Sequence, residues 1–156
     1  MGRWLEHTVS CEIQASVADA WGVWNDLEAM PLWMSWIESV KTIDGTTSTL
    51  PDLTEWTLAA NGFRFKWQAK INERIEEEKI QWESIGGLPT KGNVRFFPKE
   101  KNKTIVKLSV TYELPKAIAP LMKPTILGGM VTNELQSNID RFRDLVESGY
   151  GLEESK

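Results

Sequence analysis

Residues 17–41 read VADAWGVWNDLEAMPLWMSWIESVK and carry four of the eight tryptophans of the chain. Ser16 followed by Asp19 resembles a capping box and predicts the start of a short helix. A proline fits the first turn of a helix, so Pro31 predicts a second short helix over residues 29–36. Helices this short cannot bury so many large rings by themselves. We therefore expect them to form a V that closes one side of an internal space.

The segments on both sides of this stretch alternate between apolar and polar residues, which is the pattern of half-buried strands. Before it, every second residue from Leu5 to Ile13 shares one face. After it, strands continue to about Glu113, and Asn61-Gly62 is a strong hairpin signal. GGLPTKG, residues 86–92, is typical of a loop. We expect about seven strands in an antiparallel sheet, because most connections are short.

A long helix is predicted over residues 125–148, because apolar residues recur there at helical spacing. Such a helix would be about 36 Å long and is the one element able to cover the apolar faces of the strands. The fold class is therefore α+β, a bent antiparallel sheet around one long helix. We expect a single domain over residues 1–148 and a tail over 149–156.

Composition excludes several classes of function. The chain has 156 residues and a net charge of −4, which argues against nucleic acid as the main partner because phosphate binding needs a basic face. One cysteine permits no intrachain disulfide, which is compatible with the reducing cytoplasm. No signal peptide or membrane span is predicted. We expect a cytoplasmic protein that in some states lies at the periphery of a membrane.

Three segments carry a resemblance to a known family: residues 17–41, WTLAANGFRFKW from residue 56, and IQWESIGGLPTKGNVRFF from residue 80. With the long helix after YELP, they resemble the helix-grip (SRPBCC) superfamily of START, polyketide cyclase and coenzyme-Q-binding START-like proteins. The chain is most similar to small stand-alone members labelled cyclase/dehydrase. The resemblance implies a cavity for an apolar or aromatic molecule between the sheet and the long helix.

The apolar residues on the inward faces are the candidate lining of that cavity. An apolar pocket with few polar groups is the usual site for a small molecule. The alternative is that the same rings simply fill the core, and both interpretations stay open. The candidate ligand-binding residues are Trp21, Trp24, Trp33, Trp36, Trp56, Phe63, Phe65, Trp67, Trp82, Phe96, Tyr112, Leu127, Val131 and Leu135.

The predicted mouth of the cavity combines Asn61-Gly62, residues 86–89 and residues 115–130. The last segment contains Gly128-Gly129 and is either a movable gate or a helix start packed on the sheet. Leu88, Leu121 and Met122 are candidates for transient contact with a membrane or a donor protein.

Few polar side chains are predicted to face inward. His7, Ser84 and Tyr112 are the candidate catalytic residues, and His7 is equally typical of a hydrogen-bonded core histidine. Arg95 should point outward unless a bulge reverses it, and Asn138 lies near the apolar stripe of the helix.

Three functions follow from this pattern. The first is binding or transport of a quinone, isoprenoid, lipid or polyketide-like molecule without catalysis. The second is a cyclase or dehydratase acting on an aromatic or polyketide-like substrate. The third is a protein contact through residues 115–130. We expect no metal and no cofactor, because one histidine and one cysteine make no typical zinc site.

Overall fold

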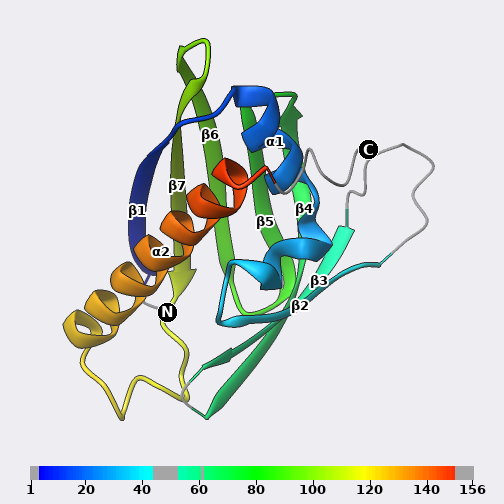
Figure 1. Ribbon diagram of the computed structural model, residues 1–156. Helices are drawn as coiled ribbons and strands as arrows, with labels where there is room; N and C mark the ends of the chain where they lie inside the picture. Colours follow the sequence, from blue (N-terminus) through cyan, green and yellow to red (C-terminus); the bar gives the residue numbers. More distant parts are fainter. Residues whose placement is uncertain (1–3, 44–52, 61, 150–156) are drawn as a thin grey trace.

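The computed structural model describes residues 4–43, 53–60 and 62–149. It contains one seven-stranded antiparallel sheet, in the order β1-β7-β6-β5-β4-β3-β2, that curls around the long helix α2 (Figure 1). This confirms the predicted fold class. The elements are β1 Trp4–Ile13, α1 Val17–Asn25, η1 Leu27–Leu32, β2 Ile37–Thr42, β3 Leu53–Ala60, β4 Phe63–Ile75, β5 Lys79–Gly87, β6 Thr90–Glu100, β7 Lys103–Glu113 and α2 Pro124–Glu147.

The strands follow the alternation that the sequence predicted. In β1 the residues at every second position from His7 are buried or half-buried, and those between them are exposed. The same holds in β4 as far as Ile71, beyond which a register shift interrupts the alternation. Ala60 pairs with Phe63, so β3 and β4 form a hairpin with a two-residue loop. Gly62 has a φ of 84°, which suits glycine in such a turn, and Asn61 lies outside the described residues.

The predicted loop over residues 86–92 is wrong in its length. Strand β5 extends through Gly87 and β6 begins at Thr90, so only two residues connect them. A Cβ atom at Gly87 would lie 2.2 Å from the carbonyl oxygen of Lys66, and the residue has a φ of 84°. Gly87 therefore continues the strand where no other residue type fits, and a glycine signal was mistaken for a loop.

The second short helix also differs from the prediction. It is a 3-10 helix over Leu27–Leu32, not a helix over residues 29–36. The backbone N–H groups of Trp33 and Met34 both donate to the carbonyl of Met30, at 3.0 and 2.8 Å, and the helix ends there. Pro31 has no N–H, so it cannot supply the hydrogen bond that an α-helix would need at this position.

The long helix α2 lies across the concave face of the sheet, near β1 and β7 (Figure 1). It begins at Pro124, which fits a first helical turn. Its fully or largely buried residues are Leu127, Asn138, Ile139, Phe142 and Val146. Within the described residues, no helix is both long and apolar enough to cross a membrane.

Candidate functional site

A cavity of about 200 Å³ lies beneath α2. Its walls come from α1, η1, the strands β2 to β7, the segment before β2, the connection before α2, and α2 as far as Asn138. The lining residues are Trp24, Met30, Met34, Trp36, Ile37, Trp56, Leu58, Ala60, Phe63, Phe65, Trp67, Trp82, Leu88, Thr90, Val110, Tyr112, Pro115, Ile118, Met122, Leu127, Met130, Val131, Glu134, Leu135 and Asn138.

Flat aromatic pairs form much of the wall. Trp56 and Trp67 face each other across β3 and β4, with ring centroids 5.8 Å apart and an angle of 9° between the rings. Phe63 and Phe65 are stacked at 6.2 Å along β4. The indole N–H of Trp56 donates to Thr54 Oγ1 at 2.7 Å, so its burial leaves no unpaired donor. All four rings line the cavity.

Trp82 owes its position to a glycine on the neighbouring strand. It pairs with Gly92 of β6, where an added Cβ would lie 2.8 Å from the Trp82 ring and 2.5 Å from the carbonyl oxygen of Ser109. The missing side chain leaves room for the indole to lie over the backbone. Glycine at position 92 therefore allows the Trp82 ring to occupy its place in the cavity wall.

Eleven of the fourteen predicted ligand-binding residues line the cavity, and their role as ligand contacts stays a prediction. Trp21, Trp33 and Phe96 are not among the lining residues and belong to the closed core instead. The other eleven are Trp24, Trp36, Trp56, Phe63, Phe65, Trp67, Trp82, Tyr112, Leu127, Val131 and Leu135.

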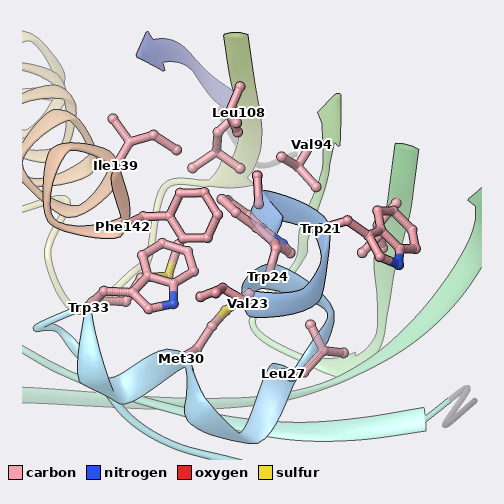
Figure 2. Close-up of a cluster of buried hydrophobic side chains, with 14 of the residues drawn as sticks. Trp21, Val23, Trp24, Leu27, Met30, Trp33, Val94, Leu108, Ile139 and Phe142 are labelled. Atoms are coloured by element: carbon pink, nitrogen blue, oxygen red, sulfur yellow. The ribbon is translucent and has the colours of Figure 1, made fainter. Parts of the chain in front are cut away.

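Each of the three exceptions packs against other aromatic rings of the closed core. Trp33 lies 4.7 Å from Trp24 and 4.9 Å from Phe142, measured between ring centroids. Phe96 meets Trp24 and Trp21 edge to face, at 6.2 and 5.5 Å. Figure 2 shows Trp24, Trp33 and Phe142 converging, while Trp21 is set apart from them. Both interpretations of the rings hold, each for a different part of the molecule.

Trp24 belongs to both the cluster and the cavity wall. Its side chain is fully buried, and its indole Nε1 has no hydrogen-bond acceptor among the described residues. The same is true of Trp33 Nε1. A buried donor without an acceptor costs about 1–3 kcal/mol. Trp24 is therefore a lining residue with an unused donor.

Four lining residues have polar side chains: Thr90, Tyr112, Glu134 and Asn138. Glu134 and Asn138 lie one turn apart on α2 and contact the loop before β2. Glu134 Oε2 accepts a hydrogen bond from the hydroxyl of Ser35. Asn138 Oδ1 accepts at 3.4 Å from the backbone N–H of Ser35 and at 3.4 Å from Arg141 Nη1. This network ties the loop to α2 at the edge of the cavity.

A second polar chain runs behind the cavity, through the one histidine. His7 Nε2 lies 3.2 Å from the hydroxyl of Tyr112, and His7 Nδ1 lies 2.9 Å from Thr132 Oγ1. Tyr112 is a lining residue, His7 is buried, and Thr132 is exposed on α2. The imidazole and phenol rings are also nearly parallel, with centroids 5.5 Å apart. The chain therefore connects the cavity wall to the surface.

Burial shifts the pKa values of these groups toward their neutral forms. Burial lowers the pKa of His7 below its ordinary value and raises the pKa of Tyr112 to about 12. Both side chains are therefore uncharged near neutral pH. A neutral imidazole has one donor and one acceptor nitrogen, and a phenol hydroxyl can act as either.

The other polar candidates have structural partners. Ser84 Oγ accepts a hydrogen bond from the backbone N–H of Thr90 at 3.0 Å, and Ser84 is not a lining residue. Arg95 is exposed, as strand alternation predicted. Glu134 was missed, although its position seven residues after Leu127 places it on the same helical stripe. Among the described residues, no three His, Cys, Asp or Glu side chains are grouped to bind a metal ion.

Parts of the predicted mouth segments line the cavity: Leu88 lies in the β5–β6 turn, and Ile118 and Met122 precede α2. Ala60 and Phe63, which flank the β3–β4 turn, line it as well. Leu121 is 70% exposed and Ile126 is 55% exposed beside them.

Residues 115–122 form successive turns before α2. The N–H groups of Ile118 and Ala119 donate to the carbonyl of Pro115, and those of Leu121 and Met122 donate to that of Ile118. A Cβ at Gly128 would meet His7 at 3.8 Å, an ordinary contact, and one at Gly129 would meet nothing within 4 Å. Close backbone packing therefore does not explain these two glycines.

The family model described as polyketide cyclase / dehydrase and lipid transport matches residues 13–143. An uncharacterised 17.2 kDa protein from Streptomyces lincolnensis is 26% identical over 139 residues, which are 88% of this chain and 87% of that protein.

Solved structures share the fold at low identity. A START superfamily protein from Mycobacterium smegmatis has a TM-score of 0.77 at 14% identity, covering 94% of this chain and 99% of that one. An aromatase/cyclase from a Streptomyces species has a TM-score of 0.73 at 15% identity, covering 96% of each chain. At these identities the likeness shows the fold alone.

Proposed function

The chain belongs to the polyketide cyclase / dehydrase and lipid transport family, and on that premise we propose that it binds a neutral, largely apolar small molecule in the cavity beneath α2. The single observation that carries the proposal is the cavity of about 200 Å³ with aromatic walls and four polar side chains. The site suits the ring of a quinone or polyketide-like molecule, or one end of an isoprenoid or lipid.

The volume supports a compact ligand head. An apolar cavity of about 150 Å³ is large enough for benzene. A space of about 200 Å³ therefore suits one or two fused rings. A longer chain would have to leave through the end lined by Leu88, Ile118 and Met122.

The charge of the wall favours a neutral ligand. Among the described lining residues there is one carboxylate, Glu134, and there is no lysine, arginine or histidine. A buried carboxylate of a fatty acid would find no cation there, and burying an unpaired charge is costly. The hydroxyl of Tyr112 favours a ligand that carries an oxygen atom.

Native mass spectrometry of the protein purified from its own cells tests this proposal, followed by organic extraction of anything that is released. We expect a one-to-one adduct that is neutral and apolar. A cavity that takes up no neutral two-ring probe, such as 1-tetralone, would contradict the proposal. The probe is needed because a protein whose ligand is weakly held would also give a native mass without an adduct.

We extend the proposal to exchange of the ligand at a membrane surface, on the basis of exposed residues near the mouth of the cavity. Leu121 and Ile126 are exposed beside the cavity-lining Met122, and Lys116 and Lys123 are exposed next to them in sequence. Apolar side chains flanked by lysines suit a bilayer that contains anionic lipids. Co-sedimentation with phosphatidylserine vesicles should fall in Leu121→Asp, whereas Ile85→Asp, at an exposed position in β5, should have no effect.

A cyclase or dehydratase is the second candidate, and the contact of Tyr112 with His7 favours it. Such chemistry needs a group that can donate or accept a proton at the ligand. Turnover of an aromatic polyketide-like substrate that is unchanged in a His7→Ala, Ser84→Ala and Tyr112→Ala triple variant would rule this candidate out.

A further inference from the structure

The chain Thr132–His7–Tyr112 can exist in two hydrogen-bonding arrangements. In the first, the Tyr112 hydroxyl donates to His7 Nε2, and His7 Nδ1 donates to Thr132 Oγ1. In the second, Thr132 donates to Nδ1, and Nε2 donates to the oxygen of Tyr112. The distances of 2.9 and 3.2 Å fit both, because heavy-atom positions do not distinguish the two tautomers.

The two arrangements present different groups at the cavity wall. When Tyr112 donates to His7, its hydroxyl can offer only lone pairs to a ligand. When His7 donates to Tyr112, the hydroxyl hydrogen is free to be donated to a ligand oxygen. A neutral imidazole exchanges the roles of its two nitrogens in passing from one arrangement to the other.

The surroundings allow this exchange. His7 is buried between β7 and α2, and Tyr112 is 9% exposed and lines the cavity. Thr132 is exposed, so its hydroxyl can turn toward solvent or toward the ring. Neither His7 nor Tyr112 has a charged partner in this chain of contacts. No fixed charge therefore selects one tautomer over the other.

We propose that His7 sets whether Tyr112 presents a hydrogen-bond donor or an acceptor to the cavity, so that one site takes aromatic ketones as well as phenols. The inference rests on the proposed binding function and names the ligand chemistry of that same site. Tyr112 is the residue that would touch the ligand, and His7 is a positioning residue that acts through it. Thr132 completes the hydrogen bonding of the buried ring.

The histidine tautomer is the readout, and this chain has one histidine. In the 15N-labelled protein, long-range proton–nitrogen correlation spectra identify which imidazole nitrogen carries the proton. The probes are tetralin, 1-tetralone and 1-naphthol, which share a two-ring body and differ in their oxygen. We expect 1-tetralone to place the proton on Nε2 and 1-naphthol to place it on Nδ1. The same tautomer in both complexes would overturn the inference.

Affinity gives an independent readout, measured by displacement of N-phenyl-1-naphthylamine. In Tyr112→Phe we expect about fivefold to tenfold weaker binding of 1-tetralone and 1-naphthol, and unchanged binding of tetralin. Ser84→Ala is the matched control, because its hydroxyl is bonded to Thr90 and does not line the cavity. Equal losses for all three probes in Tyr112→Phe would mean that the hydroxyl is merely structural, which would contradict the inference.

The experiment separates this inference from the function on which it rests. A native protein that binds neither the dye nor any of the three probes contradicts the proposed function. A protein that binds all three with equal affinity, and with one unchanged tautomer, keeps the proposed function and contradicts only the assignment of His7 and Tyr112.

Discussion

The two ends of the space beneath α2 are built from the same kinds of residue, yet one is closed and the other is open. At the closed end Trp24, Trp33 and Phe142 are fully buried, with ring centroids 4.7 to 5.0 Å apart. At the open end the stacked pairs of β3 and β4 face a cavity of about 200 Å³.

Ring orientation and helix side chains account for the difference. The closed-end rings meet at 51° to 75°, so that the edge of one fills the hollow beside another. The open-end pairs are parallel within 9°, and all four of their rings line the cavity. Phe142 of α2 reaches into the closed end, whereas the shorter Leu127, Val131 and Leu135 line the open end. Aromatic content therefore does not decide whether a core is filled.

Truncation of α2 at the two ends should give the largest contrast. We expect Phe142→Ala to lower the free energy of unfolding by about 3–5 kcal/mol, since it opens a cavity in a packed cluster. Leu135→Ala, at a half-buried position beside existing space, should cost less, about 1–2 kcal/mol. Urea denaturation measures both, and equal losses would show that the two ends are packed alike.

Filling the open end should affect binding more than stability. Val131→Phe adds a ring inside the cavity, and we expect it to weaken binding of N-phenyl-1-naphthylamine about tenfold, or ~1.4 kcal/mol. Asn133→Phe is the control, because it adds the same ring at an exposed position of α2. Fluorescence titration of the dye compares the variants. Similar weakening in both would place the dye outside this cavity.

The buried His7 makes the stability of the fold depend on pH. Burial lowers the pKa of His7 in the folded protein, so the unfolded chain binds a proton more readily. Stability is therefore full above the ordinary histidine range and falls as the pH drops through it. We expect the loss between about pH 7 and pH 5.5 to be smaller in His7→Gln. Thermal melts at both values measure the difference, and identical pH dependence in both proteins would exclude a contribution from His7.

Cys11, beside the middle of α2, should show the smallest effect. Burial raises the pKa of its thiol to about 12, and its Sγ lies 3.6 Å from the carbonyl oxygen of Ile139. We expect iodoacetamide at neutral pH to label the folded protein more slowly than the urea-unfolded chain, by about tenfold or more. Mass spectrometry follows the single cysteine, and equal rates would mean that α2 opens readily from β1.

Much of the fold could be predicted because strand and helix periods are local properties. Alternation in residues 63–71 needs only neighbouring positions, and so does the helical stripe from Leu127 to Val146. The errors arose where local signals compete. Gly86-Gly87 is typical of a loop, yet these residues continue β5. Pro31 is typical of a helix start, yet it lies within the 3-10 helix η1.

The candidate site could be predicted only in part. Strand parity placed His7 and Tyr112 on the inward face, and the helical stripe placed Val131 there. Their hydrogen bond joins residues 105 positions apart, and the bond from His7 to Thr132 spans 125 positions. Strand parity also predicted an inward position for Ser84, as it did for Tyr112. The Ser84 hydroxyl, however, accepts a hydrogen bond from the backbone N–H of Thr90.

The helix-grip architecture, the inward face of each strand and the scarcity of charge on those faces could all be predicted from residue order. The tertiary structure decided that Trp33 and Phe96 fill the closed end, that Trp56 and Trp67 wall the open end, and that Tyr112 meets His7. The physical reason is that periodicity fixes which face a residue takes, whereas ring tilt and the reach of opposing side chains from α2 fix whether that face encloses space.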